Sequence, residues 1–228
     1  MSSKVEIDKK IFKDIFNNSE KLTIFDVGTY DGSDSLEFNQ IFPLAEIFSF
    51  DADSRSVELF KKEVGNNPRI KLFETALSDV DGYVDWYSSN SETRRHYEYQ
   101  DSWSASSSIK KPDNHLNIFK DISFSQDSKV KSTKLDTWIS EHSYLDLIDI
   151  MWVDVNGGER EFIKGGLDTL KTKVKYLYIE FNGVGDKKLY KDCFTSDDIL
   201  KHLDFFELKG TYNFMGNFGN VLLKNKRL

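Results

Sequence analysis

Acidic residues and glycines are concentrated in a short turn near the N-terminus, between two apolar segments. The first apolar segment spans residues 22–27, and the second spans 47–50 and is followed at once by Asp51. The end of the first segment and the turn after it contain Asp26, Gly28, Thr29, Tyr30, Asp31, Gly32 and Asp34. A strand, a glycine-containing turn, a helix and a second strand that ends in a carboxylate form the opening of a nucleotide-type cofactor site.

The residues of this turn discriminate between cofactors. A dinucleotide site needs glycines where this chain has Tyr30 and Ser33, because its pyrophosphate approaches the backbone and its helix packs on the strand. The carboxylates of the turn would repel a diphosphate, whereas they suit a cationic ligand. Asp51 lies about 19 residues after Gly32, close to the spacing of about 20 at which an acid binds ribose hydroxyls. The turn therefore favours S-adenosylmethionine, a sulfonium and ammonium compound without phosphate, over NAD.

Two further carboxylates directly follow apolar segments in the second half of the chain. Asp154 follows the segment 147–153, and Glu180 follows the segment 174–179. Open α/β sheets gather their ligands at the carboxyl ends of such strands. A general base there can accelerate reaction of a hydroxyl group by a factor of about 10² to 10⁴. Asp154 is the first candidate for a catalytic base or a substrate anchor, and Glu180 could share that role. Alternatively, Asp154 could bind the ammonium group of the cofactor or cap the next helix.

Residues 88–131 have a different character, with serines, charges and aromatic residues in no clear period. We interpret this segment as an insertion that caps the substrate, in preference to a solvated surface loop. His96 is a third candidate catalytic base, because its pKa lies naturally in the working range. Some residues of this segment could bind a carbohydrate or an anionic group by hydrogen bonding and ring stacking. The predicted substrate-binding residues are Arg95, Tyr97, Trp103, Ser107 and, outside the insertion, Asn156.

The periodicity of the remaining sequence predicts the elements that position these residues. An N-terminal helix is expected within residues 1–20, from the apolar spacing over 7–16. Helices are also expected from residue 33 or 34, where Asp34 and Glu37 suggest a capping box, over 54–64 and around 162–170. Strands are expected at 22–27, 46–51, 69–74, 147–153 and 174–180, with an edge strand over 83–87 after a turn at Asp81-Gly82 and an antiparallel pair at 205–212 and 220–223. This order predicts an α/β, doubly wound sheet.

Composition limits the class of protein. The 228 residues carry a formal net charge of −7, which argues against a nucleic-acid substrate. Length favours a single domain over 1–228, and the sequence has neither a membrane-spanning apolar run nor a signal peptide, so we expect a cytoplasmic protein. Cys193 has no partner for a disulfide, and a Cys/His cluster at metal-ligand spacing is absent. A divalent cation would need the carboxylate oxygens of Asp154, Glu159 and Glu180 within coordination distance of one another. We predict no bound metal.

Five short motifs occur in an order that resembles the FkbM family of S-adenosylmethionine-dependent methyltransferases. The similarity extends over residues 22–182. The motifs are Asp26-Val-Gly-Thr-Tyr-Asp-Gly32, Phe50-Asp-Ala52, Ala76-Leu-Ser-Asp79, Leu135-Asp136 and Trp152-Val-Asp-Val-Asn-Gly-Gly-Glu159. The resemblance implies a class I methyltransferase fold, Rossmann-like, with a seven-stranded sheet whose last strand is antiparallel, and O-methylation of small molecules or sugars.

The motifs also define the predicted cofactor site. Its residues are Asp26, Gly28, Thr29, Tyr30, Gly32, Asp51, Ala52 and Ala76. Two positions depart from the family pattern, because Trp152 replaces a lysine and Asn156 replaces a glutamate. These departures leave open a non-catalytic scaffold that binds the cofactor or a partner. An NAD-dependent oxidoreductase is a second alternative, opposed by Tyr30 and the acidic turn. The preferred reading is an O-methyltransferase acting on a sugar or glycan hydroxyl.

Overall fold

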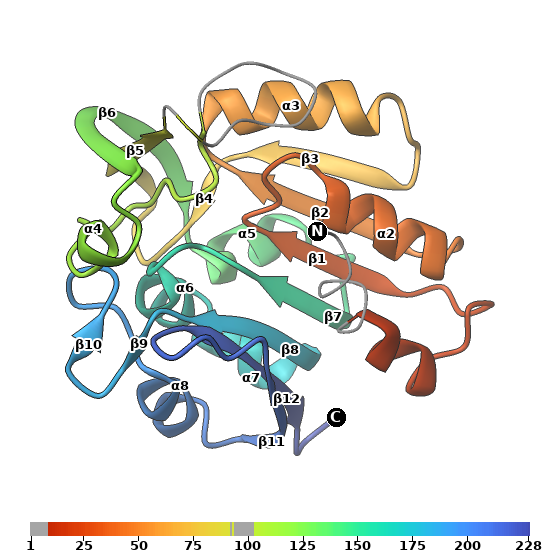
Figure 1. The fold of residues 1–228 in the computed structure, drawn as a ribbon. Coiled ribbons are helices and arrows are strands. Elements are labelled where there is room, and N and C mark those ends of the chain that lie inside the picture. The colour runs from red at the N-terminus through yellow and green to blue at the C-terminus, as the bar shows by residue number, and fades with distance from the viewer. Residues whose placement is uncertain (1–8, 92, 94–102) are drawn as a thin grey trace.

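The computed structural model describes residues 9–91, 93 and 103–228 (Figure 1). Within these residues the central element is a seven-stranded sheet with the order β11-β12-β8-β7-β1-β2-β3. Its strands are β1 (Thr23–Val27), β2 (Glu46–Asp51), β3 (Ile70–Glu74), β7 (Ile148–Val153), β8 (Val174–Phe181), β11 (Phe206–Tyr212) and β12 (Gly219–Asn225). Only β12 runs antiparallel to its neighbours β8 and β11 in this sheet. The predicted mostly parallel α/β sheet with an antiparallel last strand is confirmed.

Helices cover both faces of this sheet (Figure 1). One face carries η1 (Ile11–Asp14), α2 (Ser33–Ile41) and α3 (Ser54–Val64), and the other carries α5 (Leu135–Glu141), α6 (Glu159–Gly165), α7 (Leu167–Thr172) and α8 (Ser196–His202). Neighbouring residues of a strand serve opposite faces: Ile24 packs under the first group and Phe25 under the second. All six residues of β7 are buried, as the continuous apolar run predicts for a central strand.

A second, three-stranded sheet lies beside the carboxyl ends of the central strands. It consists of β4 (Ala76–Leu77), β6 (Ile122–Thr133) and β5 (Gly82–Ser91), and β5 and β6 are antiparallel. The segment 88–131, interpreted as an insertion without clear periodicity, therefore contains regular structure at both ends, the last residues of β5 and most of β6. Strand β6 escaped the sequence pattern because most of its residues are exposed and polar, so it lacks the apolar alternation of a half-buried strand. The segment between β5 and β6 contains the short helix α4 (His115–Ile118). A separate two-stranded sheet is formed by β9 (Gly183–Val184) and β10 (Lys187–Lys188).

Three helix predictions need correction. Residues 9 and 10 are helical, but the chain then tightens into η1 and its helical part ends at Asp14, short of residue 20; residues 1–8 lie outside the described part. The helix predicted around 162–170 is interrupted at Gly166, between α6 and α7. At α2, the N-cap is Gly32, which has no side chain to cap the helix, and the first helical N–H, that of Ser33, donates to Asp31 Oδ1 at 3.0 Å. Asp34 and Glu37 pair instead with Lys9, so a tertiary ion pair replaces the predicted capping box.

In the described part of the chain, no helix is long and apolar enough to cross a membrane.

Candidate functional site

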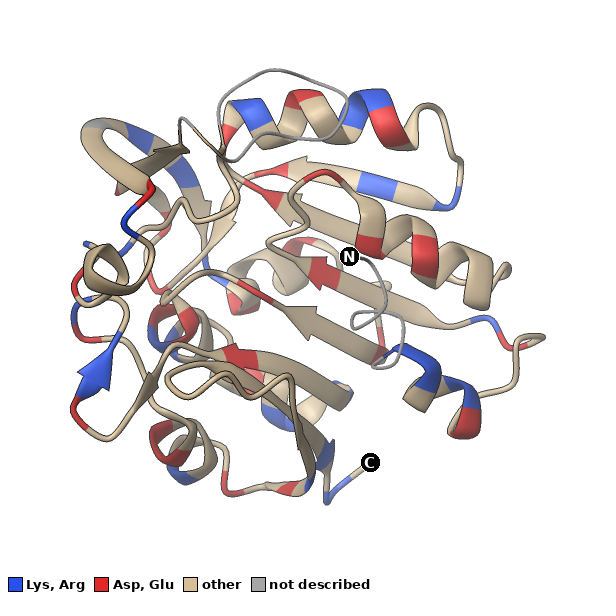
Figure 2. Cartoon of the chain, viewed as in Figure 1, with Lys and Arg blue, Asp and Glu red and all other residues tan. Residues whose placement is uncertain are grey.

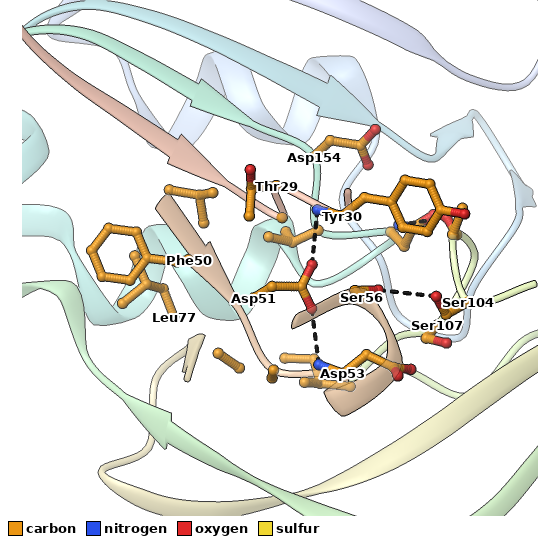
Figure 3. Close-up of a pocket in the computed structure, with 18 of the residues that line it drawn as sticks. Thr29, Tyr30, Phe50, Asp51, Asp53, Ser56, Leu77, Ser104, Ser107 and Asp154 are labelled. Carbon is orange, nitrogen blue, oxygen red and sulfur yellow. Dashed lines mark hydrogen bonds between the residues drawn. The ribbon is translucent and has the colours of Figure 1, made fainter. Parts of the chain in front are cut away.

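A cavity opens at the carboxyl ends of β1, β2 and β7, under the segment 103–109 (Figure 3). Of the predicted cofactor residues, those that line it are Gly28, Thr29, Tyr30, Asp51, Ala52 and Ala76. Asp154, Ser107 and Asn156 also line it. Figure 2 shows acidic residues at the ends of β1, β2 and β8 and after β7. None of the described lining residues is Lys, Arg or His, so the cavity favours a cationic or neutral ligand.

The glycine turn after β1 has a steric cause. Gly28 adopts φ +84, and a Cβ placed there would lie 1.7 Å from the backbone oxygen of Asp154. The turn is anchored on β2, because Gly28 N and Thr29 N donate to the Phe50 carbonyl at 2.9 and 3.1 Å. Only glycine permits this conformation and this close approach of β1 to the end of β7.

Two predicted cofactor residues, Asp26 and Gly32, are not among the described residues that line the cavity. Asp26 is completely buried and accepts hydrogen bonds from the hydroxyl groups of Thr29, at 2.6 Å, and Ser35. Burial raises its pKa to about 7. Gly32 lets α2 approach α3, since a Cβ there would lie 2.6 Å from the Phe60 ring. Both residues therefore shape the turn from behind.

Asp51 connects the turns that follow β1 and β2. Its Oδ2 accepts from Tyr30 N at 2.9 Å and its Oδ1 accepts from Asp53 N at 2.8 Å (Figure 3). Burial raises the pKa of Asp51 to about 7, against the lowering effect of these backbone hydrogen bonds. A carboxylate has about four lone-pair sites, so Asp51 can still accept hydrogen bonds from ribose hydroxyls.

A polar network that sequence reasoning missed fastens the segment 103–109 over the cavity. Asp53 caps α3 by accepting from Arg55 N at 3.0 Å, pairs with the Arg55 guanidinium at 2.6 Å, and accepts from Trp86 Nε1 at 3.3 Å. Arg55 also donates to the Ser89 carbonyl, and Ser56 and Ser104 share a hydrogen bond of 3.0 Å. The position of Asp53 before a predicted helix was a usable signal for the cap. Nothing local indicates Trp86 or Ser104.

The insertion residues predicted to bind substrate have different outcomes. Ser107 lines the cavity and accepts from Ser89 N at 3.0 Å. Trp103 is not among the described lining residues, although its ring centroid lies 6.3 Å from that of Tyr30. Arg95, His96 and Tyr97 lie outside the described residues, so their roles stay predictions.

Asn156 connects the end of β7 to the segment 103–109. It adopts a positive φ of 51, and its side chain donates to the Ala105 carbonyl at 3.3 Å. Ser108 donates to the Asn156 carbonyl at 2.6 Å. Tyr190 donates to the Ser106 carbonyl at 3.0 Å and contacts the Asn156 amide oxygen at 3.4 Å. This end of the cavity is therefore surrounded by hydroxyl and amide groups.

Three carboxyl groups lie together at this end: Glu159 is buried, and Asp154 and Glu180 are half-buried. Asp154 and Glu180 share a side-chain hydrogen bond, and Asn182 donates to Glu180 at 2.7 Å and to Glu159 at 3.1 Å. Burial raises the pKa of Asp154 to about 6 and of Glu159 to about 8, and raises that of Glu180 well above its ordinary value. Glu180 is consequently the protonated partner, and it donates to the Asp154 carboxylate. Glu180 is not among the described residues that line the cavity.

The acidic cluster is not arranged as a metal site. Among the described residues, no group of three His, Cys, Asp or Glu side chains is placed to hold a metal ion. Glu159 lies at the start of α6 and accepts from Gly157 N at 3.0 Å. Its contact with the backbone before the helix accounts for its position without a role in the reaction.

The departure from the family pattern at Trp152 has a structural counterpart. The indole nitrogen of Trp152 donates to Asp34 Oδ2 at 3.1 Å. The ammonium group of Lys9 lies 4.9 Å from the Trp152 ring centroid and pairs with Asp34. A cation from the N-terminal segment thus lies beside the position where the family pattern has a lysine.

Comparisons with known proteins agree with this geometry. A curated relative, the 2-O-methyltransferase NoeI of Sinorhizobium fredii (strain NBRC 101917 / NGR234), is 36% identical over 221 residues, covering 96% of this chain and 86% of the relative. Magnesium protoporphyrin IX methyltransferase (ChlM) of Synechocystis PCC 6803 with bound SAM has a TM-score of 0.51 at 11% identity, covering 97% of this chain and 77% of that one. A SAM-dependent methyltransferase of Aquifex aeolicus has a TM-score of 0.50 at 13% identity, covering 94% and 87%. Both solved structures share the fold.

Residues 26–213 match the FkbM methyltransferase domain, a range that includes the glycine turn, the cavity and the buried acids. The match favours a methyltransferase over the NAD-dependent alternative. Together with the fold, it confirms the predicted class I architecture and S-adenosylmethionine as the cofactor. The chain belongs to the FkbM family of methyltransferases.

Proposed function

We propose that this protein is an O-methyltransferase that uses S-adenosylmethionine to methylate a hydroxyl group of a sugar or glycan. The observation that carries the proposal is the position of Asp154, which lines the cavity and is hydrogen-bonded from behind by Glu180. One oxygen of a carboxylate held in this way is available to a hydroxyl group in the cavity. A base is what a hydroxyl acceptor needs at neutral pH.

The residues of the cavity fit the cofactor by their chemistry. The absence of Lys, Arg and His among the described lining residues suits a sulfonium compound and disfavours a diphosphate. Asp51 would accept hydrogen bonds from the ribose hydroxyls. Phe50 and Leu77, which line the same cavity, would provide an apolar surface for the adenine ring.

The reaction depends mainly on positioning. S-adenosylmethionine, when bound, supplies an electrophilic methyl group for an in-line displacement. Asp154 would orient the acceptor hydroxyl and take its proton, while the hydrogen bond from Glu180 fixes the carboxylate. The segment 103–109, fastened by Asn156 and Tyr190, would exclude bulk water from the acceptor.

The acceptor class is inferred from the groups available to bind it. Asn156, Ser104 and Ser107 line the cavity with amide and hydroxyl groups, which form hydrogen bonds with neutral polyols. The curated relative is named for methylation at a 2-O position, which supports a hydroxyl acceptor. Arg95, Tyr97 and His96 are further candidates for acceptor contacts.

Methyl transfer from radiolabelled S-adenosylmethionine to a panel of free, activated and oligomeric sugars would test the proposal. We expect label in at least one sugar, in a bond that resists mild base as an ether does and an ester does not. Asp154→Asn is the matched control: it should still bind S-adenosylhomocysteine, while methyl transfer from S-adenosylmethionine should fall by about 10² to 10⁴. Binding of S-adenosylhomocysteine by the wild type without transfer to any sugar, RNA or protein would support the non-catalytic scaffold and contradict the proposal.

A further inference from the structure

Lys9 is a charged residue in an apolar place. Its side chain is completely buried on the sheet face covered by α2, where its ammonium lies 5.7 Å from the Phe38 ring centroid and 4.9 Å from that of Trp152. It donates to Asp34 Oδ1, and to Glu37 Oε2 at 2.6 Å. Burial alone would lower the pKa of Lys9, but Asp34 and Glu37 outweigh it and raise the pKa above its ordinary value. The lysine is therefore a permanent buried cation.

Asp34 connects this cation to the cavity. Its side chain lines the cavity and is 30% exposed. Its Oδ1 accepts from Lys9 and its Oδ2 accepts from Trp152 Nε1 at 3.1 Å, so both oxygens have a fixed donor. Two donors on two different elements leave the carboxylate little freedom to rotate. Lys9 also compensates the charge that Asp34 would otherwise bring alone to a partly buried site.

The location of Asp34 identifies the end of the cofactor that it faces. Its hydrogen bond from Trp152 of β7, which pairs with Asp26 of β1, places it on the side of the cavity where β1 and β7 end. Asp51, the proposed ribose ligand, lies at the end of β2. A carboxylate on the β1–β7 side would meet the methionine end of the cofactor, whose α-ammonium group prefers a charge-assisted hydrogen bond.

We propose that Lys9 is a positioning residue of the cofactor site: through Asp34, and together with Trp152, it aligns a carboxylate for the α-ammonium group of S-adenosylmethionine. The inference rests on the cofactor placement given under the proposed function. It assigns a role to the N-terminal segment, which lies outside residues 26–213 of the matched domain, and it gives Trp152 a function as the second donor to Asp34.

The test compares two ligands that differ only at the methionine end. S-adenosylhomocysteine carries the amino-acid group, and 5′-methylthioadenosine lacks it. Isothermal titration calorimetry measures both affinities. Lys9→Met should weaken the binding of S-adenosylhomocysteine about tenfold and should change the affinity for 5′-methylthioadenosine by less than about twofold. The ratio of the affinity for S-adenosylhomocysteine to the affinity for 5′-methylthioadenosine does not depend on the fraction of folded protein. A purely structural role of Lys9 would therefore leave this ratio unchanged.

A matched control and three further variants make the result decisive. Lys175→Met removes another half-buried ion pair, 2.7 Å to Asp149, away from the described lining residues, and should leave the ratio unchanged. Trp152→Phe keeps the ring and removes the donor to Asp34, so it should lower the ratio even if Lys9→Met fails to fold. Asp34→Asn should lower it as well, and adding Lys9→Met to Asp34→Asn should lower it no further.

An equal loss for both ligands, or an unchanged ratio in Lys9→Met and Trp152→Phe, would overturn the inference. Failure of the proposed function would look different. In that case the wild type would still prefer S-adenosylhomocysteine over 5′-methylthioadenosine, and it would transfer no methyl group to a sugar.

Discussion

The carboxyl group of Glu180 donates a hydrogen bond to the carboxylate of Asp154 across the carboxyl ends of adjacent parallel strands, where Val153 of β7 pairs with Ile179 of β8. Burial keeps the Glu180 proton in place, and that proton in turn favours the ionised form of Asp154. In the proposed mechanism the two acids therefore have separate roles: Asp154, which lines the cavity, would act as the base, and Glu180 would hold its carboxylate in place.

Asp154→Asn should reduce turnover by about 10² to 10⁴, the usual contribution of a general base. The amide keeps the size and most of the hydrogen bonding of the carboxylate, so the fold should be preserved. Single-turnover rates with the wild type and the variant, each saturated with cofactor, provide the measurement. Full activity of the variant would remove Asp154 as the base.

The activity should increase with pH, as expected for a reaction that needs a deprotonated general base. Asp154 has a pKa of about 6, so turnover should be lost as the pH falls below about 6 and should reach a plateau above it. In Glu180→Gln the amide still donates to Asp154, and the profile should stay nearly in place. In Glu180→Leu the donor is lost, and the profile should move to higher pH. Identical profiles for these two variants would contradict the role of Glu180.

Glu159 predicts a pH dependence of stability. Its folded pKa of about 8 lies above the ordinary 4.5, so the folded state binds the proton more tightly than the unfolded chain. Its contribution to the free energy of unfolding is present below about pH 4.5 and is lost as the pH rises to about 8. Glu159→Gln should therefore reduce the difference in melting temperature between pH 5 and pH 8 by more than about 2 °C, if the effect exceeds about 1 kcal/mol. Differential scanning calorimetry at both pH values measures it, and an unchanged difference would refute the assignment.

Asp51→Ala should weaken the binding of S-adenosylhomocysteine more than the binding of the sugar acceptor, because only the cofactor carries the ribose that Asp51 is proposed to bind. The variant also leaves Tyr30 N and Asp53 N without their acceptor, at a cost of about 1–3 kcal/mol each if they stay buried. Asp51→Asn keeps one acceptor oxygen and should lose less stability. Calorimetric titration with each ligand separates binding from stability, and an unchanged cofactor affinity in Asp51→Ala would count against the ribose contact.

Gly28→Ala should destabilise the fold by at least about 3 kcal/mol, because the added Cβ would meet the Asp154 backbone oxygen at 1.7 Å. Gly65 is the matched control: its φ of +59 is also positive, but nothing lies within 4 Å of an added Cβ. Gly65→Ala should cost only the strain of a backbone conformation that favours glycine (φ 59, ψ −142), about 1–3 kcal/mol. Urea denaturation compares the two, and equal losses would show that the contact between the ends of β1 and β7 is not tight.

The sequence alone determined the elements whose evidence is local. The bounds of β2 and α3 agree with the predicted 46–51 and 54–64, because an apolar strand and a helix ended by a glycine show their limits in their own residues. The placement of Asp51 at the cavity follows from its spacing after the glycine turn. Asp154 and Glu180 could be singled out because each directly follows an apolar run in the sequence.

Only the tertiary structure decided which of these groups meet and what surrounds them. Lys9 is 25 residues from Asp34 in sequence, and Trp152 is 118 residues from it, so no local pattern could show that both fix one carboxylate. Strand β6 is polar and becomes a strand through its pairing with β5, and Ser104 reaches the cavity through its hydrogen bond with Ser56. Periodicity records what one segment buries, whereas the ion pairs and hydrogen bonds that complete this site join segments that meet only when the chain has folded.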